Sequence, residues 1–402
     1  MYDPKRAALL RAPAVSLLYA AVAASHKAPC FAIAAAAGCV AGSHPESNAM
    51  PATPPLRFAI IGAGNIAKIY VQAFAAIPDA QVTVICNRTE STGRPLAAQA
   101  GADWLPDFHD AVRRADVDAV VIATPSGLHA EPAVAAAQAG KHLLVEKPLD
   151  ITLARADSII HAAEAAGVVL ACVFPLRFGE GPRHAKAALE AGRLGRLALA
   201  DVYVKWYRPP AYYQNPWRGR WPTDGGGALM NQAIHNIDLV QWLAGPVREV
   251  VGRTATLVHT IETEDTASAL LTFANGALGV IQGATSAWPG DPARVELHGD
   301  RGTIILEEGR ITTWKLADAT PDEEAAMLAL EVGGGSGAAD PMAIGFEKHR
   351  RQIVDLMQAI RDGRPPAIQG SEARRAVELV RAVYRAAARR TPVTLPLTDD
   401  SL

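Results

Sequence analysis

The chain has 402 residues, of which 50% are hydrophobic and 20% charged, and its formal net charge is -2. This composition excludes an intrinsically disordered protein, and the length allows two domains with separate cores. Because the charge is near neutral and Lys and Arg are dispersed, no field attracts nucleic acid or an anionic membrane, and we expect neither partner.

Residues 1–55 form an Ala-rich extension that differs from the rest of the chain. Its apolar runs, AVSLLYAAVAAS and FAIAAAAGCVAG, are too short to span a bilayer. Lys5 and Arg6 precede them, so a secretory signal and export stay open as an alternative. We favour a disordered extension or a start codon placed too far upstream, with Met50 opening the functional protein, and expect a cytoplasmic location.

A glycine-rich turn lies between a predicted strand and a predicted helix in LRFAIIGAGNIAKIYVQAF, residues 56–74. The GxGxxA pattern in this context is typical of dinucleotide-binding domains. Gly62 permits the tight turn, and Gly64 lets the backbone approach a pyrophosphate at the helix N-terminus, where Asn65 and Ile66 follow. We expect these four residues to bind the cofactor; a simple βα turn is the alternative.

The second predicted strand, QVTVICN, ends at Asn87, about 20 residues beyond the glycines, where such domains recognise the ribose. A carboxylate there would accept hydrogen bonds from the ribose 2′-OH and repel a 2′-phosphate. The chain carries Asn87 and Arg88 instead, which suit a 2′-phosphate better. The cofactor is predicted to be NAD or NADP, with NADP favoured, although Arg88 could equally stack on adenine or point into solvent.

Helices and apolar strands alternate over residues 56–175, which predicts a Rossmann domain with a doubly wound parallel sheet. Thr124 and Pro125 follow one predicted strand, and His129 opens the helix after it. Because open sheets of this kind bind ligands at the carboxyl ends of their strands, these residues are predicted to contact the cofactor.

The stretch LLVEKPLD, residues 143–150, carries a buried strand to its end. Proline cannot continue a central strand, so Glu146 and Lys147 are expected to reach the cofactor edge just before Pro148. A solvated lysine that merely closes the strand is the alternative.

The regular alternation stops in residues 176–396, where strands follow one another closely and two helices close the chain. This order predicts a separate α+β domain with a large, mostly antiparallel open sheet, and final helices that pack back toward the Rossmann domain. Residues 397–402 form a tail. The acidic, Gly-rich residues 317–341 predict a surface loop.

Asn231, His235 and Asp238 recur at i, i+4 and i+7, on one face of a helix predicted to start near Ala228. A histidine on such a helix is more often a hydrogen-bonded core residue than a catalyst. Asp238 is expected to orient His235 or to cap a neighbouring element. Aromatic and arginine side chains just upstream suit a polyhydroxylated ligand, although aromatics are equally often core or oligomer contacts.

These motifs resemble the Gfo/Idh/MocA family, named for glucose-fructose oxidoreductase and inositol dehydrogenase. The resemblance spans residues 56–396 and rests on AIIGAGNIA, ATPSGLHAEPA, VEKPL, GGGALMNQAIHNIDLVQWL, EDTASALLTFANGALG and PPAIQGSEARRAVELV. It implies a Rossmann domain, a C-terminal domain built on an open sheet, and a homodimer or homotetramer joined through that sheet. It also implies NAD(P)-dependent oxidation or reduction of a sugar, cyclitol or sugar-derivative hydroxyl.

The resemblance also implies the catalytic residues. Lys147 matches the lysine that contacts the reacting hydroxyl and the nicotinamide, and His235 matches the usual proton acceptor. The residue four before this histidine is commonly Asp and here is Asn231, which can hold a hydroxyl but cannot take a proton. The residues expected to contact the substrate are Arg177, Tyr213, Trp217, Arg218, Asn231 and His235.

The chemistry of hydride transfer requires groups of the kind that these assignments provide. When a secondary alcohol is oxidised, a histidine can take the departing proton and a cationic lysine favours alkoxide character on the oxygen. The reaction needs no metal, and we predict none. Two alternatives stay open: an NAD-dependent glycoside hydrolase that works by transient oxidation and elimination, and a cofactor-sensing protein without catalysis. The presence of both Lys147 and His235 argues against the sensor.

Overall fold

The computed structural model describes residues 54–330 and 345–402. The predicted N-terminal extension, except for its last two residues, and residues 331–341 of the predicted loop lie outside this part of the chain. Within it, no helix has both the length and the apolar character needed to cross a membrane.

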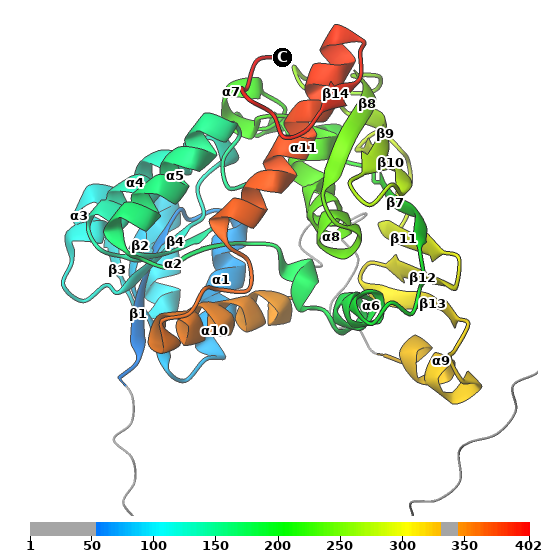
Figure 1. Ribbon diagram of the computed structural model, residues 1–402. Helices are drawn as coiled ribbons and strands as arrows, with labels where there is room; N and C mark the ends of the chain where they lie inside the picture. Colours follow the sequence, from blue (N-terminus) through cyan, green and yellow to red (C-terminus); the bar gives the residue numbers. More distant parts are fainter. Residues whose placement is uncertain (1–53, 331–344) are drawn as a thin grey trace, which may run out of the picture. The chain divides into compact units, whose positions relative to one another are not determined.

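The first domain is built on a parallel six-stranded sheet in the order β3-β2-β1-β4-β5-β6 (Figure 1). Its strands are β1 (Leu56–Ile61), β2 (Ala80–Cys86), β3 (Asp103–Leu105), β4 (Ala119–Ile122), β5 (His142–Val145) and β6 (Leu170–Cys172). The connecting helices are α1 (Asn65–Ala75), α2 (Glu90–Ala100), α3 (Phe108–Arg113), η1 (Ser126–Leu128), α4 (Ala130–Gln138) and α5 (Leu153–Ala166). Every residue of β4 is buried, as expected for a strand covered on both faces. The predicted doubly wound sheet is confirmed, with its switch point between β1 and β4.

The second sheet has eight strands in the order β13-β12-β11-β7-β10-β9-β8-β14. The β7–β10 pair is parallel and the other pairs of described strands are antiparallel, which confirms the prediction of a mostly antiparallel sheet. The strands are β7 (Leu197–Lys205), β8 (Val247–Ala255), β9 (Thr266–Phe273), β10 (Leu278–Ala284), β11 (Arg294–Gly299), β12 (Gly302–Glu307), β13 (Arg310–Leu316) and β14 (Val393–Thr394).

The remaining helices lie on the second sheet or between the two sheets (Figure 1). They are η2 (Pro175–Phe178), α6 (Glu180–Glu190), η3 (Pro210–Gln214), α7 (Trp221–Asp224), the π-helix η4 (Ala228–Ala233), α8 (Ile234–Ala244), α9 (Pro321–Leu328), α10 (Glu347–Asp362) and α11 (Gly370–Arg389). Helices α8 and α11 contact the sheet at β7 and β8, whereas α10 contacts α1 and α11 also contacts α5. The last two helices therefore bind the two sheets into one unit, which extends over residues 53–402.

Helix α9 corrects the prediction of a loop over residues 317–341. The Thr320 hydroxyl accepts a hydrogen bond from the backbone N–H of Glu323 at 3.2 Å, and Pro321 occupies the first helical turn. Three acidic residues lie in that same turn. The acidic composition that indicated a loop instead stabilises a helix N-terminus through its dipole.

Candidate active site

The glycine turn after β1 leaves the N-terminus of α1 open. Gly62 has φ +113°, and a Cβ there would lie 2.4 Å from the Ala123 carbonyl oxygen, so only glycine fits. Gly64 precedes α1, and a Cβ there would meet nothing within 4 Å. No described side chain caps the helix, and the exposed Asn65 begins it. These residues fit the pyrophosphate of a dinucleotide, which the free N–H groups can bind.

Asn87 lies at the end of β2, beside the glycine turn. Its amide nitrogen donates to the Thr89 carbonyl at 2.9 Å and to the Thr92 hydroxyl at 2.6 Å. The side-chain oxygen remains available as an acceptor, which suits a ribose hydroxyl better than a phosphate. Arg88 is exposed, so a 2′-phosphate would depend on Arg88 rather than on Asn87.

Thr124, Pro125 and His129 form the loop between β4 and α4. His129 is only 1% exposed, and its two ring nitrogens lie 2.8 Å from the Pro148 carbonyl and 3.0 Å from the Thr124 carbonyl. Burial lowers the pKa of His129. His129 thus ties two loops of the cofactor edge together, and its contact with the cofactor stays a prediction.

Glu146 is buried at the end of β5 and connects this strand to α1. Its carboxylate accepts a hydrogen bond from the Tyr70 hydroxyl at 2.7 Å and another from the backbone N–H of Lys147 at 3.1 Å. Burial raises the pKa of Glu146, and the neighbouring Lys147 charge opposes that rise. Glu146 therefore holds the Lys147 backbone and lies behind it, on the Rossmann side of the site.

Lys147 reaches from the first domain to the second. Its Nζ donates to the backbone carbonyl of Asn231 at 2.6 Å. Burial lowers the pKa of Lys147, the charge of Glu146 raises it, and the Arg218 guanidinium lowers it further. The ammonium group is thus held at the junction of the cofactor edge and the π-helix η4.

His235 lies at the start of α8, one turn after Asn231. Its Nδ1 is buried and has no hydrogen-bond partner among the described residues. Burial holds the pKa of His235 well below 6.5, and the positive charge of Lys147 lowers it further. An imidazole that is neutral and has an unpartnered ring nitrogen can accept a proton.

Three successive glycines explain how the π-helix η4 comes so close to the sheet. A Cβ on Gly227 would lie 1.7 Å from the backbone oxygen of Glu264. The Glu264 carboxylate accepts hydrogen bonds from the backbone N–H groups of Gly227 and Leu229, each at 2.9 Å, and from the Tyr384 hydroxyl at 2.8 Å. Glu264 thus fixes the N-terminus of the segment that carries Asn231.

The Asn231 side chain lies in a polar network that the sequence did not predict. Its amide nitrogen donates to Asp224, and its oxygen accepts from the Gln232 amide at 2.9 Å and from Arg218 at 3.3 Å. Gln232 in turn accepts from the buried Arg208 at 3.0 Å. Asp224 lies directly before the three glycines in the sequence, and this position is the feature that could have indicated its place in the site.

The upstream aromatic residues divide into two groups. The Arg218 guanidinium lies over the rings of Tyr212 and Trp217, at 4.0 and 4.4 Å from their centroids. Tyr213 instead exchanges a hydrogen bond with the Thr285 hydroxyl at 2.7 Å. Arg218 and Tyr212 therefore adjoin Asn231, and Trp217 reaches this group through Arg218, whereas the Tyr213 hydroxyl is engaged by Thr285.

Asp238 corrects one prediction, because it does not orient His235. Its carboxylate accepts two hydrogen bonds from Arg177, at 2.6 and 2.8 Å, and both residues are buried. Arg177 also donates to Glu372 at 3.2 Å. The Arg177 guanidinium is thus engaged by two carboxylates, and its contact with substrate stays a prediction.

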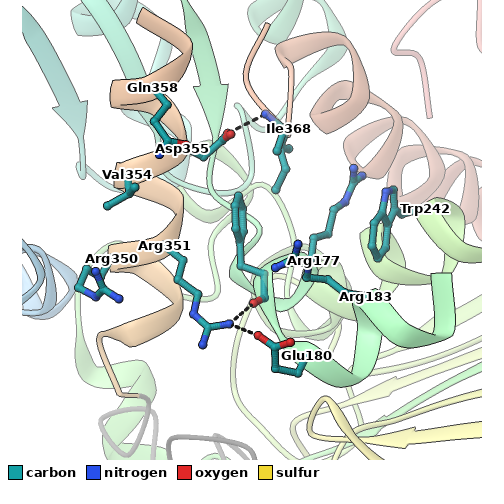
Figure 2. A pocket seen from close by; sticks show the side chains of 12 residues that line it. Arg177, Glu180, Arg183, Trp242, Arg350, Arg351, Val354, Asp355, Gln358 and Ile368 are labelled. Atoms are coloured by element: carbon teal, nitrogen blue, oxygen red, sulfur yellow. Dashed lines mark hydrogen bonds and ion pairs between the residues drawn. The ribbon is translucent and has the colours of Figure 1, made fainter. Parts of the chain in front are cut away.

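Arg177 lines a separate cavity of about 530 Å³ between α10 and the helices α6 and α8. Figure 2 shows Arg177, Arg183 and Trp242 on one side of this cavity and Arg351 of α10 on the other. Neither Lys147 nor His235 lines it. The Arg351 guanidinium is already paired there, because it donates to the Glu180 carboxylate and to the Phe178 backbone carbonyl.

Within the described residues, no group of three or more His, Cys, Asp and Glu side chains is arranged to hold a metal ion.

A Rossmann domain with a glycine turn of this kind is typical of nicotinamide-dependent dehydrogenases and reductases. A family model described as "Oxidoreductase family, NAD-binding Rossmann fold" matches residues 56–174, and one described as "GFO/IDH/MocA C-terminal domain" matches residues 183–305. The chain belongs to the Gfo/Idh/MocA oxidoreductase family.

Several relatives are enzymes acting on sugars or cyclitols. Myo-inositol 2-dehydrogenase of Thermotoga maritima is 28% identical over 338 residues, covering 81% of this chain and 94% of the relative. The 1,5-anhydro-D-fructose reductase of Ensifer adhaerens is 30% identical over 252 residues, covering 62% of this chain and 75% of the relative. Among solved structures, the WlbA dehydrogenase of Bordetella pertussis in complex with NADH and UDP-GlcNAcA has a TM-score of 0.77 and 33% identity, covering 85% of this chain and 99% of that one.

Proposed function

We propose that this enzyme transfers a hydride between a nicotinamide cofactor and a secondary hydroxyl or ketone of a sugar, cyclitol or sugar derivative, with His235 exchanging the proton and Lys147 orienting the hydroxyl. One observation carries the proposal. The Lys147 ammonium, from the cofactor edge, is bonded at 2.6 Å to the helical segment whose next turn presents the unpartnered ring nitrogen of His235. We propose the cytoplasm, where free cofactor is available, as the compartment.

When bound, the cofactor supplies the carbon that accepts or donates the hydride. Lys147 donates a hydrogen bond to the substrate oxygen and stabilises the negative charge that develops there. His235 takes the proton from this oxygen during oxidation and returns it during reduction. Burial of both groups strengthens these interactions, because the local dielectric constant is low.

The charges around Asn231 favour an anionic sugar derivative as substrate. The ammonium of Lys147 is influenced by two guanidinium groups, Arg208 and Arg218, and by two carboxylates, Glu146 and Asp224. No described carboxylate forms an ion pair with Arg218, which is poised to bind a carboxylate or phosphate. The UDP-GlcNAcA bound to the similar WlbA dehydrogenase agrees with this choice.

A substrate panel tests the proposed function. Inositols, neutral sugars, uronic acids and sugar nucleotides are each incubated with NAD and NADP, and nicotinamide absorbance is followed. We expect turnover of at least one member, with acidic sugars ahead of their neutral counterparts. Hydrolysis of a glycoside without net cofactor turnover would favour the glycoside hydrolase alternative, and binding of cofactor without any chemistry would favour the sensor.

Replacing Arg88 by alanine tests the cofactor preference. If Arg88 binds the 2′-phosphate, R88A loses about tenfold or more in affinity for NADPH and little for NADH, because one charge-assisted hydrogen bond contributes about 1.5–3 kcal/mol. Fluorescence titration with each reduced cofactor measures both constants. Arg94→Ala is the control, since Arg94 is paired with Glu90 at 2.8 Å. Equal losses for both cofactors in R88A would remove the phosphate role and leave NAD as the proposed cofactor.

The open face of the second sheet supports assembly into a homodimer or homotetramer. Leu270 of β9 is 62% exposed and is paired across strands with Val251 of β8 and Val280 of β10. Leu278 is 55% exposed and lies beside Leu199 of β7. We propose that a second copy of the chain covers this apolar stripe, since such patches mark association surfaces.

Leu270→Lys is therefore expected to convert the assembly to monomers, because it places a charge in the centre of the stripe. Size-exclusion chromatography with light scattering measures the mass. Leu328→Lys is the matched control, since Leu328 is an exposed leucine of α9 outside the sheet. A monomeric wild-type protein, or an L270K variant that keeps its assembly, would contradict the proposed interface.

A further inference from the structure

We propose that Asp224 is a positioning residue of this active site, which fixes the orientation of the Asn231 amide and supplies the counter-charge to Lys147. This inference rests on the proposed function for its role in turnover. The hydrogen bonds that carry it are independent of that function.

Asp224 is built into the site with no freedom to turn toward solvent. It ends α7 and is 2% exposed. One carboxylate oxygen accepts a hydrogen bond from the backbone N–H of Gly219 at 2.9 Å, and the other accepts from the Asn231 amide nitrogen. A buried carboxylate persists only where donors satisfy it, so the Asn231 amide is part of what holds this charge in place.

The same bond decides which way the Asn231 amide points. An ionised carboxylate can only accept, so the nitrogen of Asn231 must face Asp224. The oxygen of Asn231 then faces three donors, the Gln232 amide at 2.9 Å and Arg218 and Tyr212 at 3.3 Å each. If the Asn231 amide were reversed, its oxygen would face the Asp224 carboxylate and its nitrogen would face these three donors, and both contacts would be repulsive. Asn231 therefore presents its second N–H, and not its oxygen, to a substrate hydroxyl.

Asp224 also acts on Lys147 through its charge. Arg208 and Arg218 disfavour the ammonium form of Lys147, whereas Glu146 and Asp224 favour it. Glu146 is engaged with Tyr70 on the far side, at 2.7 Å. Neutralising Asp224 removes one of these two favourable charges and leaves Glu146 alone to oppose the two guanidinium groups, so the pKa of Lys147 falls and the loss of its charge moves to lower pH.

An exchange of the two side chains tests this pair. In the Asp224→Asn variant, an amide nitrogen of residue 224 faces the amide nitrogen of Asn231. In the Asn231→Asp variant, two carboxylates face each other. Each single variant is expected to lose about 10–100-fold in turnover, the equivalent of about 1.4–2.7 kcal/mol of misplaced polar contacts. The double variant D224N/N231D keeps one carboxylate and one amide, and every donor of the pair is still matched to an acceptor. It lacks the Asn231 N–H that faces the substrate, but a substrate hydroxyl can donate to the carboxylate at 231 instead, so we expect it to recover part of the loss. Losses that simply add in the double variant would overturn the proposal.

A second measurement does not depend on the substrate. The rate at which an amine reagent labels Lys147 is followed against pH, with the modified peptide identified by mass spectrometry. D224N should shift the labelling midpoint to lower pH, and D224N/N231D should restore it. Glu262→Gln is the control, because Glu262 is an exposed carboxylate that contacts α7 at Trp221 without touching Asn231.

The outcomes separate the two proposals. If the wild-type protein turns over no member of the panel but the midpoint shifts, the proposed function fails and the Asp224 pair stands. If turnover is found but D224N changes neither the midpoint nor the rate, the Asp224 proposal is wrong. Should D224N fail to fold, the double variant alone decides, because it preserves the hydrogen-bond pattern.

Discussion

Replacing Lys147 by methionine is expected to lower kcat/KM about 10²–10³-fold while the protein still folds and binds NADH. Methionine keeps the apolar stem of the lysine and removes the ammonium that donates to the Asn231 carbonyl at 2.6 Å. The loss follows because the substrate oxygen then develops its charge without a cation beside it. Steady-state kinetics on the substrate found in the panel measure kcat/KM, and fluorescence titration measures NADH binding.

Lys141→Met is the matched control for this variant. The Lys141 ammonium also donates to backbone carbonyls, those of Arg114 at 3.0 Å and Val117 at 2.8 Å, but it lies at the opposite end of β5. K141M should lower the melting temperature and leave kcat/KM almost unchanged. A K147M enzyme with near wild-type kcat/KM would remove Lys147 from the chemistry.

Local patterns were sufficient to predict the first domain. Buried parallel strands are apolar on both faces, and the glycine turn must avoid a Cβ at Gly62, so both features leave a direct signal in the sequence. The end of strand β5 just before Glu146 and Lys147 was also predictable, because Pro148 cannot continue a central strand. These signals depend on neighbours in the chain and not on the tertiary structure.

The partners of buried polar residues could not be read from the sequence in the same way. Asp238 was expected to act on His235 or to cap a neighbouring element, but its partner Arg177 lies 61 positions away in the chain. Helical periodicity gives the face on which a residue lies and not the group that packs against that face. The Asp224–Asn231 pair depends on a π-turn that no 3.6-residue pattern predicts.

His235→Ala is expected to lower turnover about 10²–10⁴-fold, because the variant lacks the imidazole that we propose takes the proton from the substrate oxygen. His161→Ala, a change at an exposed histidine of α5, is the control and should keep wild-type kinetics. Cofactor titration and thermal melting of H235A check that the fold and the NADH site survive. Retention of wild-type turnover in H235A would show that the proton leaves by another route.

The pH dependence distinguishes a catalytic His235 from a residue that only shapes the site. Burial and the Lys147 charge hold the pKa of His235 well below 6.5, so the neutral base persists into acid and kcat/KM for oxidation should fall only well below pH 6.5. Removing the Lys147 charge raises the pKa of His235, because protonation of the imidazole is then opposed less. The residual activity of K147M should therefore fall at higher pH than that of the wild-type enzyme. If the fall of kcat/KM toward acid pH occurs in K147M at the same pH as in the wild-type enzyme, or at a lower pH, the group that controls the rate is not an imidazole next to Lys147.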